Sequence, residues 1–433
     1  MAIAELSRIQ ELLERARRGA IVDERKRVRF EDPSSEEALE ELKEVVISML
    51  IGEAEIEEAS RWIASLTSEL FRAVSSLGGS GWTMPKEMKS FVKDPRAHLR
   101  KKLFLYSFDL LRGKIELERF LTKARAALTT SLRTNMRAVY QSWVLASILS
   151  RLGELGGRLV YPEHGYVPLD RSGRQRAGSI PSNAVVRIGR GELSIFVEAP
   201  RPVGWEDTRD LRSVWRLYVM LRPDMLFYSG RVLDIARLDG EGLPVLRPDA
   251  VVECKELSDW YLRSRELRGP STRPLSAEEW MTKWLEGLWV GLSDALGVSE
   301  EEAAEIAKKS RGVRVSEVEL VKLYARLYSP RRFFLVSRPV LPSEARRELE
   351  SEGIEVVEGV EVGRRRELEE LAEELAELAS PAGLRDPLSD LADLLASRGV
   401  RVERRALEEA LAELAERRLA ELLEILRARE SAS

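Results

Sequence analysis

The sequence contains very few of the residues that build zinc sites or histidine-based catalytic centres. Its 433 residues include one cysteine, Cys254, and two histidines, His98 and His164. An internal disulfide is therefore excluded, and Cys/His zinc sites or a histidine-centred triad would need more ligands or partners than the chain has. Any catalytic metal must be held by oxygen ligands.

Signals for membrane insertion, secretion and nucleotide hydrolysis are also missing. The first residues lack the basic and apolar regions of a signal peptide, and no apolar run approaches the ~18 residues of a membrane span. The patterns Gly-x4-Gly-Lys-Ser/Thr and Gly-x-Ser-x-Gly do not occur, which excludes a phosphate loop and a nucleophile-elbow hydrolase. We therefore expect a cytoplasmic protein without a membrane partner.

Side-chain amides are scarce, whereas charged residues are abundant. Asn and Gln together number five, 33% of the residues are charged, and Arg outnumbers Lys 55 to 14. This composition favours a thermophilic origin. The net charge is −4, but residues 1–130 carry +1, residues 131–340 carry +5 and residues 341–433 carry −10. Because electrostatic attraction acts locally, we expect the middle region to meet a polyanion despite the acidic C-terminal region.

Hydrophobic periodicity divides the chain into three regions. Residues 1–130 are predicted to be helical, residues 131–360 to form a core of strands and helices, and residues 361–433 to form acidic helices. The predicted strands are short apolar runs at 184–188, 193–197, 225–228, 250–254, 333–336 and 354–357. This order predicts an α/β fold with a mixed sheet flanked by helices and with helical extensions at both ends. The C-terminal helices are candidates for packing, for homodimer formation or for contact with a protein partner.

The chemically informative segment is Asp224, at the start of one apolar run, followed by Glu253-Cys254-Lys255 at the end of the next. Four acidic-x-Lys triplets occur in the chain, about twice the number expected from composition. Only Glu253-x-Lys255 ends a strand-like run and is preceded by a Pro-Asp that begins another. Lys255 is also the only lysine between residues 124 and 282.

Strand geometry predicts that these three side chains form one site. Residues i and i+2 of a strand point to the same face, so Glu253 and Lys255 project together, and Asp224 on a neighbouring strand can lie across from Glu253. Two carboxylates, the carbonyl of Cys254 and water form a hard-oxygen site suited to Mg²⁺ or Mn²⁺. Such an ion can polarise a phosphoryl oxygen and acidify a water, while Lys255 holds that water or neutralises charge on the phosphate.

These residues resemble the PD-(D/E)XK nuclease superfamily, which has the restriction-endonuclease-like fold. The resemblance covers roughly residues 133–360 and implies a helix, three antiparallel-to-mixed strands, a helix and a further strand. It also implies one or two divalent ions and cleavage of phosphodiester bonds, with Asp224, Glu253 and Lys255 as catalytic residues. The segment Val139-Tyr140-Gln141-Ser142-Trp143 is similar to the Tyr-Glu-x-Trp helix of some McrC-like relatives, which carry an acidic residue where this chain has Gln141.

Other residues remain candidates for accessory roles. Asp249 repeats the Arg-Pro-Asp phrase of Asp224, but four residues of strand place it about 13 Å from Glu253, too far for one shared ion without a bulge. We therefore favour Asp224 as the first carboxylate and expect Asp249 to start a strand or to lie near the substrate. Glu198, at the end of a predicted strand, is a candidate additional acid, and Gln141 a candidate accessory residue.

The sequence thus predicts a divalent-metal-dependent nuclease, with DNA a better candidate than RNA. Phosphate contacts need cations near the core, and the candidates are Arg222, Arg247, Lys322 and Arg326. The alternative is a non-catalytic nucleic-acid-binding or assembly protein that retains the nuclease fold, in which Asp224, Glu253 and Lys255 form a structural ion-pair cluster.

Overall fold

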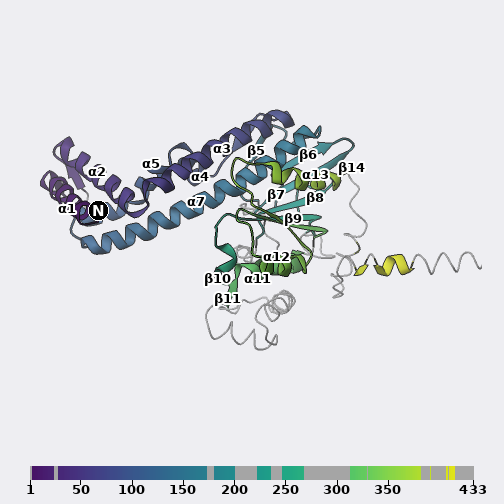
Figure 1. The fold of residues 1–433 in the computed structure, drawn as a ribbon. Coiled ribbons are helices and arrows are strands. Elements are labelled where there is room, and N and C mark those ends of the chain that lie inside the picture. Colours follow the sequence, from purple (N-terminus) through teal and green to yellow (C-terminus); the bar gives the residue numbers. More distant parts are fainter. Residues whose placement is uncertain are drawn as a thin grey trace, which may run out of the picture. The chain divides into compact units, whose positions relative to one another are not determined.

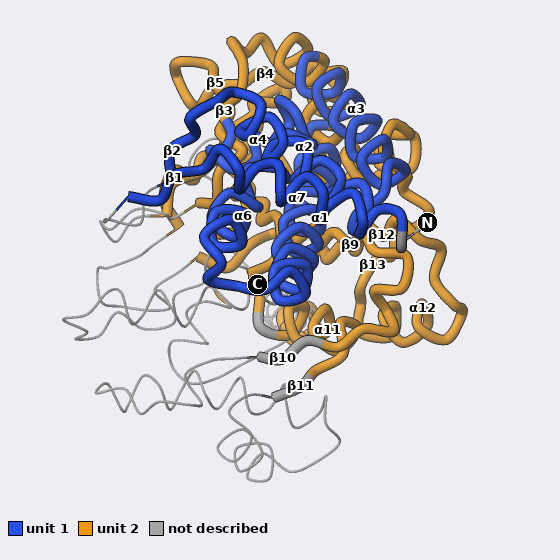
Figure 2. The backbone as a smooth tube through the Cα atoms, turned by 90° about the vertical axis from the view of Figure 1, so that its left-hand side faces the viewer, with its two compact units in different colours: residues 1–71, 84–146 blue, residues 72–83, 147–433 orange. Residues whose placement is uncertain are grey.

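The protein is described from a computed structural model. The structure describes residues 2–23, 28–172, 180–199, 222–235, 246–267, 313–328 and 330–381, and positions 391, 406, 407 and 409–414. The chain divides into two compact units (Figure 2). Unit 1 comprises residues 1–71 and 84–146, and unit 2 comprises residues 72–83 and 147–433. No helix among the described residues is both long and apolar enough to cross a membrane.

Unit 1 is helical (Figure 1). Its helices are α1 (Ala2–Arg18), α2 (Pro33–Leu50), α3 (Glu53–Leu77), α4 (Lys86–Lys93), α5 (Pro95–Lys102), α6 (Phe104–Leu111) and α7 (Leu117–Glu154), with a short hairpin of β1 (Ala20–Val22) and β2 (Val28–Phe30). Helix α2 begins where Asp32 caps the backbone N–H of Ser35 and Pro33 occupies the first turn. Apolar side chains of α1, α2, α5, α6 and α7 form the core of this unit. The last turns of α3 and α7 belong to unit 2.

Unit 2 is built on one mixed sheet. Its strands, in spatial order, are β13 (Ile354–Glu358), β12 (Arg332–Ser337), β9 (Ala250–Lys255), β8 (Met225–Ser229), β7 (Gly191–Val197), β6 (Ala184–Ile188) and β4 (Arg158–Tyr161). Strands β4, β6, β7, β8 and β9 pair antiparallel, whereas β12 is parallel to β9 and β13 is parallel to β12. The strands agree closely with the predicted apolar runs, and the predicted mixed α/β class is confirmed.

Smaller pairings complete the described part of unit 2. Strand β3 (Gly81–Thr83) pairs with β5 (Tyr166–Pro168), and β10 (Ser264–Leu267) pairs with β11 (Val313–Ser316). A short 3₁₀ turn, η1 (Trp260–Leu262), precedes β10, and another, η3 (Arg366–Leu368), precedes α13 (Glu369–Glu377). Helix α11 (Glu317–Tyr328) lies between β11 and β12, and α12 (Ser343–Glu350) connects β12 to β13.

One face of the sheet packs against α11. Phe196, Leu226, Val251, Phe333 and Leu335 belong to the same buried cluster as the apolar residues of this helix. The strand residues in this cluster define which side of each strand faces α11, because side chains alternate between the two faces of a sheet. This parity fixes the face on which the candidate site residues lie.

The described start of the C-terminal region belongs to unit 2. The apolar side chains Leu368, Leu371 and Leu375 are buried, and the Leu378 carbonyl accepts a hydrogen bond from Ser229 Oγ at 2.6 Å. Strand β14 (Ser380–Pro381) then pairs with β7. In the structure the first unit comprises residues 1–71 and 84–146, and the described residues 361–381 lie in the second unit with the sheet. The predicted boundaries at residues 130 and 360 stay predictions. Most of the remaining acidic region lies outside the described residues, as does its predicted role in dimer or partner contacts.

Candidate active site at the β8–β9 edge

Asp224 and Glu253 lie opposite one another at one end of the β8–β9 pair. Met225 is opposite Val252 in this antiparallel ladder, so continuing the register by one residue pairs Asp224 with Glu253. Asp224 has the parity of Leu226, and Glu253 has the parity of Val251, both of which face α11. The two carboxylates therefore project from the same face of the sheet.

Hydrogen bonds to the backbone fix both carboxylates. The Cys254 N–H donates to Asp224 Oδ2 at 2.7 Å, and the Asp224 N–H donates to Glu253 Oε2 at 3.2 Å. The Asp224 carboxylate is thus bonded to the backbone of β9, and the Glu253 carboxylate to the backbone at the start of β8. Asp224 and Glu253 are only 6% and 4% exposed, so this arrangement is held inside the protein rather than on a solvated surface.

Lys255 joins this pair to helix α11. Its ammonium lies 2.9 Å from Glu253 Oε1 and 2.8 Å from Glu317 Oε2, and it lies over the ring of Trp260 at 5.8 Å from the centroid. Trp260 is fixed in turn because its indole N–H donates to Ser337 Oγ at 3.0 Å. Lys255 and Glu317 are both buried. The lysine is therefore held in one place by two carboxylates and an aromatic face.

Glu317 was not predicted as a site residue. It is the first residue of α11, where an acidic side chain is common because it interacts favourably with the helix dipole. More than 60 residues separate it from Lys255, so no spacing rule connects the two. The contact arises because β12 runs parallel beside β9 and α11 precedes β12 along the chain.

The donor set at this edge suits a hard divalent cation. Asp224, Glu253, Glu317 and Lys255 carry a formal charge of −2 together. The N–H of Cys254 points toward β8, and because the N–H and C=O of one strand residue point to the same side, its carbonyl also points to the β8 side of β9. Mg²⁺ is commonly held by one or two carboxylates and keeps several waters. The residues present therefore fit such an ion.

The fit is limited to this small ligand set. In the described ranges, no group of three or more His, Cys, Asp or Glu side chains is arranged to hold a metal ion. The ligands at the β8–β9 edge would be Asp224, Glu253 and the Cys254 carbonyl, with water completing the shell. The Cys254 thiol is not a ligand candidate: burial, with a contribution from the Asp224 and Glu253 carboxylates, raises the pKa of this thiol well above its ordinary value.

Glu198 continues the row of acidic residues onto β7. Val197 is opposite Met225, so the register brings Glu198 next to Asp224, and the Glu198 N–H donates to the Asp224 carbonyl at 2.8 Å. Glu198 has a φ of +43° and is the only non-glycine residue with positive φ among those described. Its carboxylate forms an ion pair with Arg171. The strand thus ends at Glu198 in a strained conformation beside the site.

Arg222 also lies at this edge. Its guanidinium is half-buried and donates to the Glu198 carbonyl at 3.5 Å. Burial, together with the nearby Arg171, lowers the pKa of Arg222 to about 10, so it still carries its charge at neutral pH. Two arginines therefore lie near the acidic row.

Asp249 and Arg247 lie at the other end of β9. The Asp249 carboxylate accepts the Ser229 N–H at 2.7 Å, and its carbonyl accepts the Arg332 N–H at 3.0 Å. Asp249 therefore starts a strand and ties it to β8. Arg247 is 8% exposed, so its side chain has little surface to offer a phosphate. Neither residue joins Asp224 and Glu253.

The remaining predicted residues lie elsewhere. Lys322 pairs with Glu319 and Glu348, and Arg326 pairs with Glu352, so these cations on α11 take part in structural ion pairs. Gln141 is a half-buried residue in the part of α7 that belongs to unit 1, whereas the site belongs to unit 2. Its accessory role therefore stays a prediction from the sequence.

Comparisons of the chain with protein-family models, with curated protein sequences and with solved structures find no significant match. The geometry of the β8–β9 edge is thus the basis for a functional proposal.

Proposed function

We propose that this protein is a divalent-metal-dependent nuclease of the PD-(D/E)XK type, which hydrolyses phosphodiester bonds and acts on DNA in preference to RNA. The observation that carries the proposal is the convergence of Asp224, Glu253 and Lys255 on one face at the edge of two paired strands. Each of these side chains is buried and fixed by hydrogen bonds or ion pairs, as a preorganised site requires.

The order of elements supports the same proposal. Helix α7 is followed by the antiparallel strands β7, β8 and β9, then by α11 and by β12, which is parallel to β9. This is the order that the resemblance to the restriction-endonuclease-like fold implies. Strands β4, β6 and β13 extend the sheet beyond that core.

The roles of the side chains follow from their chemistry. A bound Mg²⁺ would polarise a phosphoryl oxygen and lower the pKa of a coordinated water. Asp224 and Glu253 would hold the ion, helped by the Cys254 carbonyl, and Lys255 would orient the attacking water or neutralise charge on the phosphate. Arg222 adds a cation at the same edge for a substrate phosphate.

A cleavage assay tests this proposal. Full-length protein is incubated with labelled single- and double-stranded DNA and RNA, with Mg²⁺, with Mn²⁺ and with a chelator. We expect DNA to be cut in the presence of either metal and not with the chelator. No cleavage of any substrate under any metal condition would contradict the nuclease proposal and favour the alternative, a nucleic-acid-binding protein in which the same cluster has a structural role.

Glu317 is expected to act as a positioning residue for Lys255. Replacing it by glutamine keeps the size of the side chain but removes the charge that holds the ammonium, so kcat should fall about 10–100-fold with KM unchanged. Glu319→Gln on the same helix is the matched control, since Glu319 pairs with Lys322 rather than Lys255. Equal effects of the two substitutions on kcat would show that Glu317 has no specific role.

A further inference from the structure

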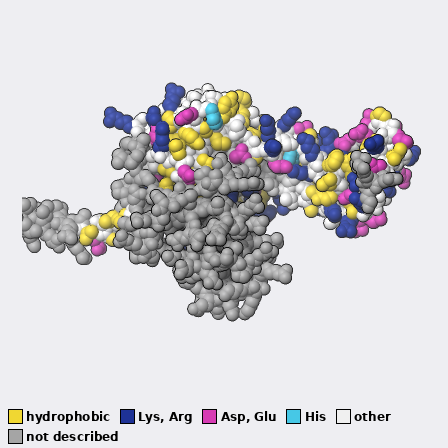
Figure 3. Space-filling model, turned by 180° about the vertical axis from the view of Figure 1, so that it is seen from behind, with side chains coloured by type: hydrophobic (Ala, Val, Ile, Leu, Met, Phe, Trp, Pro, Cys, Tyr) yellow, Lys and Arg dark blue, Asp and Glu magenta, His cyan; other side chains and the backbone are white. Residues whose placement is uncertain are grey.

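Unit 1 has an uneven distribution of charge that its total conceals. Residues 1–71 carry a net charge of −7, whereas residues 84–146, which contain α4, α5, α6 and most of α7, carry +9. Figure 3 shows Lys and Arg side chains gathered over the middle of the helical unit. Both segments belong to one compact unit. The positive charge of this unit is therefore concentrated in residues 84–146, and the net charge of the whole unit does not show it.

Helix α7 is the clearest part of this basic segment. From Arg119 to Gly153, 35 consecutive residues contain no Asp or Glu, although about six would be expected from the composition of the chain. The same stretch contains six Arg or Lys residues. A solvated helix in this protein commonly carries both signs of charge, as α1 and α2 do. The absence of acids between Glu118 and Glu154 sets this stretch of α7 apart.

Four of these cations share one face of the helix. At 100° per residue, Arg119, Lys123, Arg133 and Arg137 fall within about 80° of one another, and they span about 27 Å along the axis. Ala124 and Leu128 lie about 140° and 180° around the helix from Arg119 and are fully buried, as is Phe120 at about 100°. We refer to Arg119, Lys123, Arg133 and Arg137 as the α7 cationic face. Ala126 and Thr130 lie between the cations and are exposed, so they leave room for a partner to approach the helix.

The cations of this face differ from those nearby in their contacts. Within the described residues, Arg119, Arg133 and Arg137 form no ion pair with an acidic side chain, and Lys123 lies over the ring of Tyr106 at 5.6 Å. By contrast, three of the four cations of α5 are neutralised: Arg96 pairs with Glu44 and Glu53, Arg100 with Glu44, and Lys102 with Glu87. A structural ion-pair role explains these three cations of α5 but not Arg119, Arg133 and Arg137 of the α7 cationic face.

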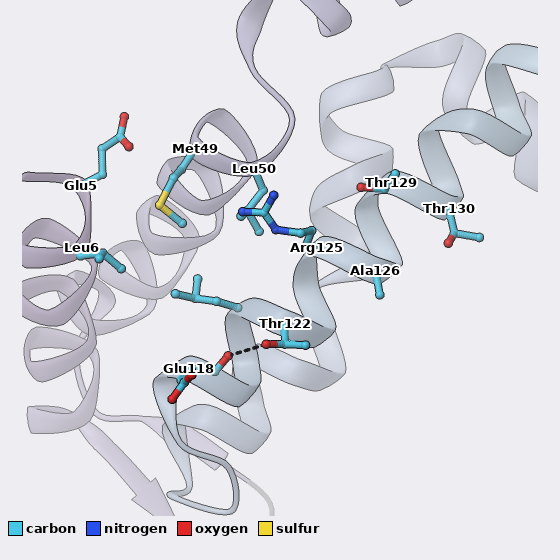
Figure 4. Close-up of a pocket in the computed structure, with 11 residues that line it drawn as sticks. Glu5, Leu6, Met49, Leu50, Glu118, Thr122, Arg125, Ala126, Thr129 and Thr130 are labelled. Carbon is cyan, nitrogen blue, oxygen red and sulfur yellow. Dashed lines mark hydrogen bonds between the residues drawn. The ribbon is translucent and has the colours of Figure 1, made fainter. Parts of the chain in front are cut away.

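A groove borders the α7 cationic face (Figure 4). It has a volume of about 900 Å³ and lies between α7 and side chains of α1 and α2. Thr122, Ala126 and Thr130 of α7 line it, and so do the carboxylates of Glu5 and Glu118 at one end. Arg125 extends from α7 toward Leu50 of α2 and adds a fifth cation beside the face. The Arg125 guanidinium is a donor of the kind that contacts phosphate oxygens, whereas the Thr122 hydroxyl already donates to the Glu118 carbonyl at 3.0 Å.

We propose that the α7 cationic face binds the sugar-phosphate backbone of nucleic acid, outside the candidate active site. Its charge complements a polyanion, and its length of about 27 Å spans several phosphates of a strand. The contacts are to the backbone and carry no sequence information. This proposal rests on the proposed nuclease function in one respect: that function identifies the polyanion as nucleic acid. Binding itself is measured without cleavage.

The experiment compares a quadruple variant with a matched control. Arg119→Gln, Lys123→Gln, Arg133→Gln and Arg137→Gln are combined in full-length protein that also carries Asp224→Asn, so that no substrate is cut. The control removes the same charge from elsewhere in unit 1 through Arg8→Gln, Arg15→Gln, Arg18→Gln and Lys114→Gln. Binding to a short labelled DNA duplex and to single strands of DNA and RNA is measured against salt concentration, and circular dichroism checks folding.

We expect the quadruple variant to bind at least one of these probes on the order of a hundredfold more weakly near 0.1 M salt. The slope of log binding constant against log salt concentration should be shallower by about three. The control should retain most of the affinity. An unchanged affinity or slope in the folded quadruple variant would overturn the proposal, as would equal losses in both variants. A parent protein that binds heparin or anionic vesicles but no nucleic acid would also overturn it.

These outcomes separate the surface from the active site. If the unmodified protein cuts DNA but the quadruple variant binds normally, the nuclease proposal stands and the α7 proposal is wrong. If the unmodified protein cuts nothing but the quadruple variant loses nucleic-acid binding, the α7 proposal stands and the nuclease proposal is wrong.

Discussion

Lys255→Ala is expected to abolish cleavage while leaving nucleic-acid affinity nearly unchanged. Lys255 is held by Glu253 and Glu317 beside the proposed metal ligands, where it would act on the attacking water or on the charge of the transition state. It contributes only one cation, and a buried one, to an extended contact. The measurements are the rate of DNA cleavage with Mg²⁺ and the affinity for the same DNA with a chelator.

The substitution also has a structural cost that the experiment must separate from catalysis. Removing one partner of a buried ion pair commonly costs about 3–5 kcal/mol, because charge is left buried without compensation. Lys255→Met keeps more of the packing against Trp260 and should be equally inactive. Its thermal unfolding shows whether the loss of activity occurs in folded protein.

Lys43 provides the matched control. It is a buried lysine of helix α2 that pairs with Glu40 at 2.6 Å, lies near the rings of Phe104 and Phe108, and ends another Glu-x-Lys triplet. Lys43→Ala should lower stability and leave the cleavage rate per folded molecule unchanged. If Lys255→Met reduces binding and cleavage in parallel, Lys255 belongs to substrate recognition rather than to chemistry.

The strands and the central acidic pair could be predicted from the sequence because their signals are local. Short apolar runs mark buried strands, and the alternation of side chains along a strand places Glu253 and Lys255 on one face whatever the surrounding fold. Asp224 could be assigned because it begins the apolar run that pairs with the run ending in Glu253. The accessory candidate Glu198 followed from the same logic, since it ends the strand next to β8.

Contacts between distant segments could not be predicted in the same way. Glu317 reaches Lys255 only through the position of α11, and no local pattern encodes that position. Arg247, Lys322 and Arg326 were predicted from charge alone, but charge does not reveal that Arg247 is buried or that the other two pair with glutamates. Dividing the charge at residue 130 also mixed the acidic helices α1–α3 with the basic segment 84–146 and so concealed the α7 cationic face.

The two Arg-Pro-Asp phrases of the sequence provide an internal comparison. Asp224 and Asp249 are both buried, and each accepts a backbone N–H of the neighbouring strand at 2.7 Å. They lie at opposite ends of the β8–β9 pair. Only Asp224 lies at the end of the β8–β9 pair that also carries Glu253 and Lys255. Replacing each aspartate by asparagine therefore separates a role in metal binding from a role in strand pairing.

Asp224→Asn is therefore expected to lower Mg²⁺-dependent cleavage at least about 10³-fold without destabilising the protein. The amide keeps the shape and can still accept the Cys254 N–H, but it removes a ligand charge worth several kcal/mol to the metal site. It also relieves repulsion in a buried cluster whose formal charge is −2. Asp249→Asn weakens a charge-assisted bond to Ser229 and should cost on the order of 1–2 kcal/mol of unfolding free energy with the cleavage rate retained.

The two variants are compared by cleavage rate, by thermal unfolding and by calorimetric titration with Mn²⁺. Loss of Mn²⁺ binding in Asp224→Asn but not in Asp249→Asn is the expected pattern. If Asp249→Asn abolishes cleavage and Asp224→Asn does not, the reactive end of the sheet has been assigned wrongly. Should both variants bind Mn²⁺ as the unmodified protein does, the ion is held elsewhere and the acidic pair at the β8–β9 edge serves the fold, since a carboxylate that contributes a ligand cannot be neutralised without loss of metal affinity.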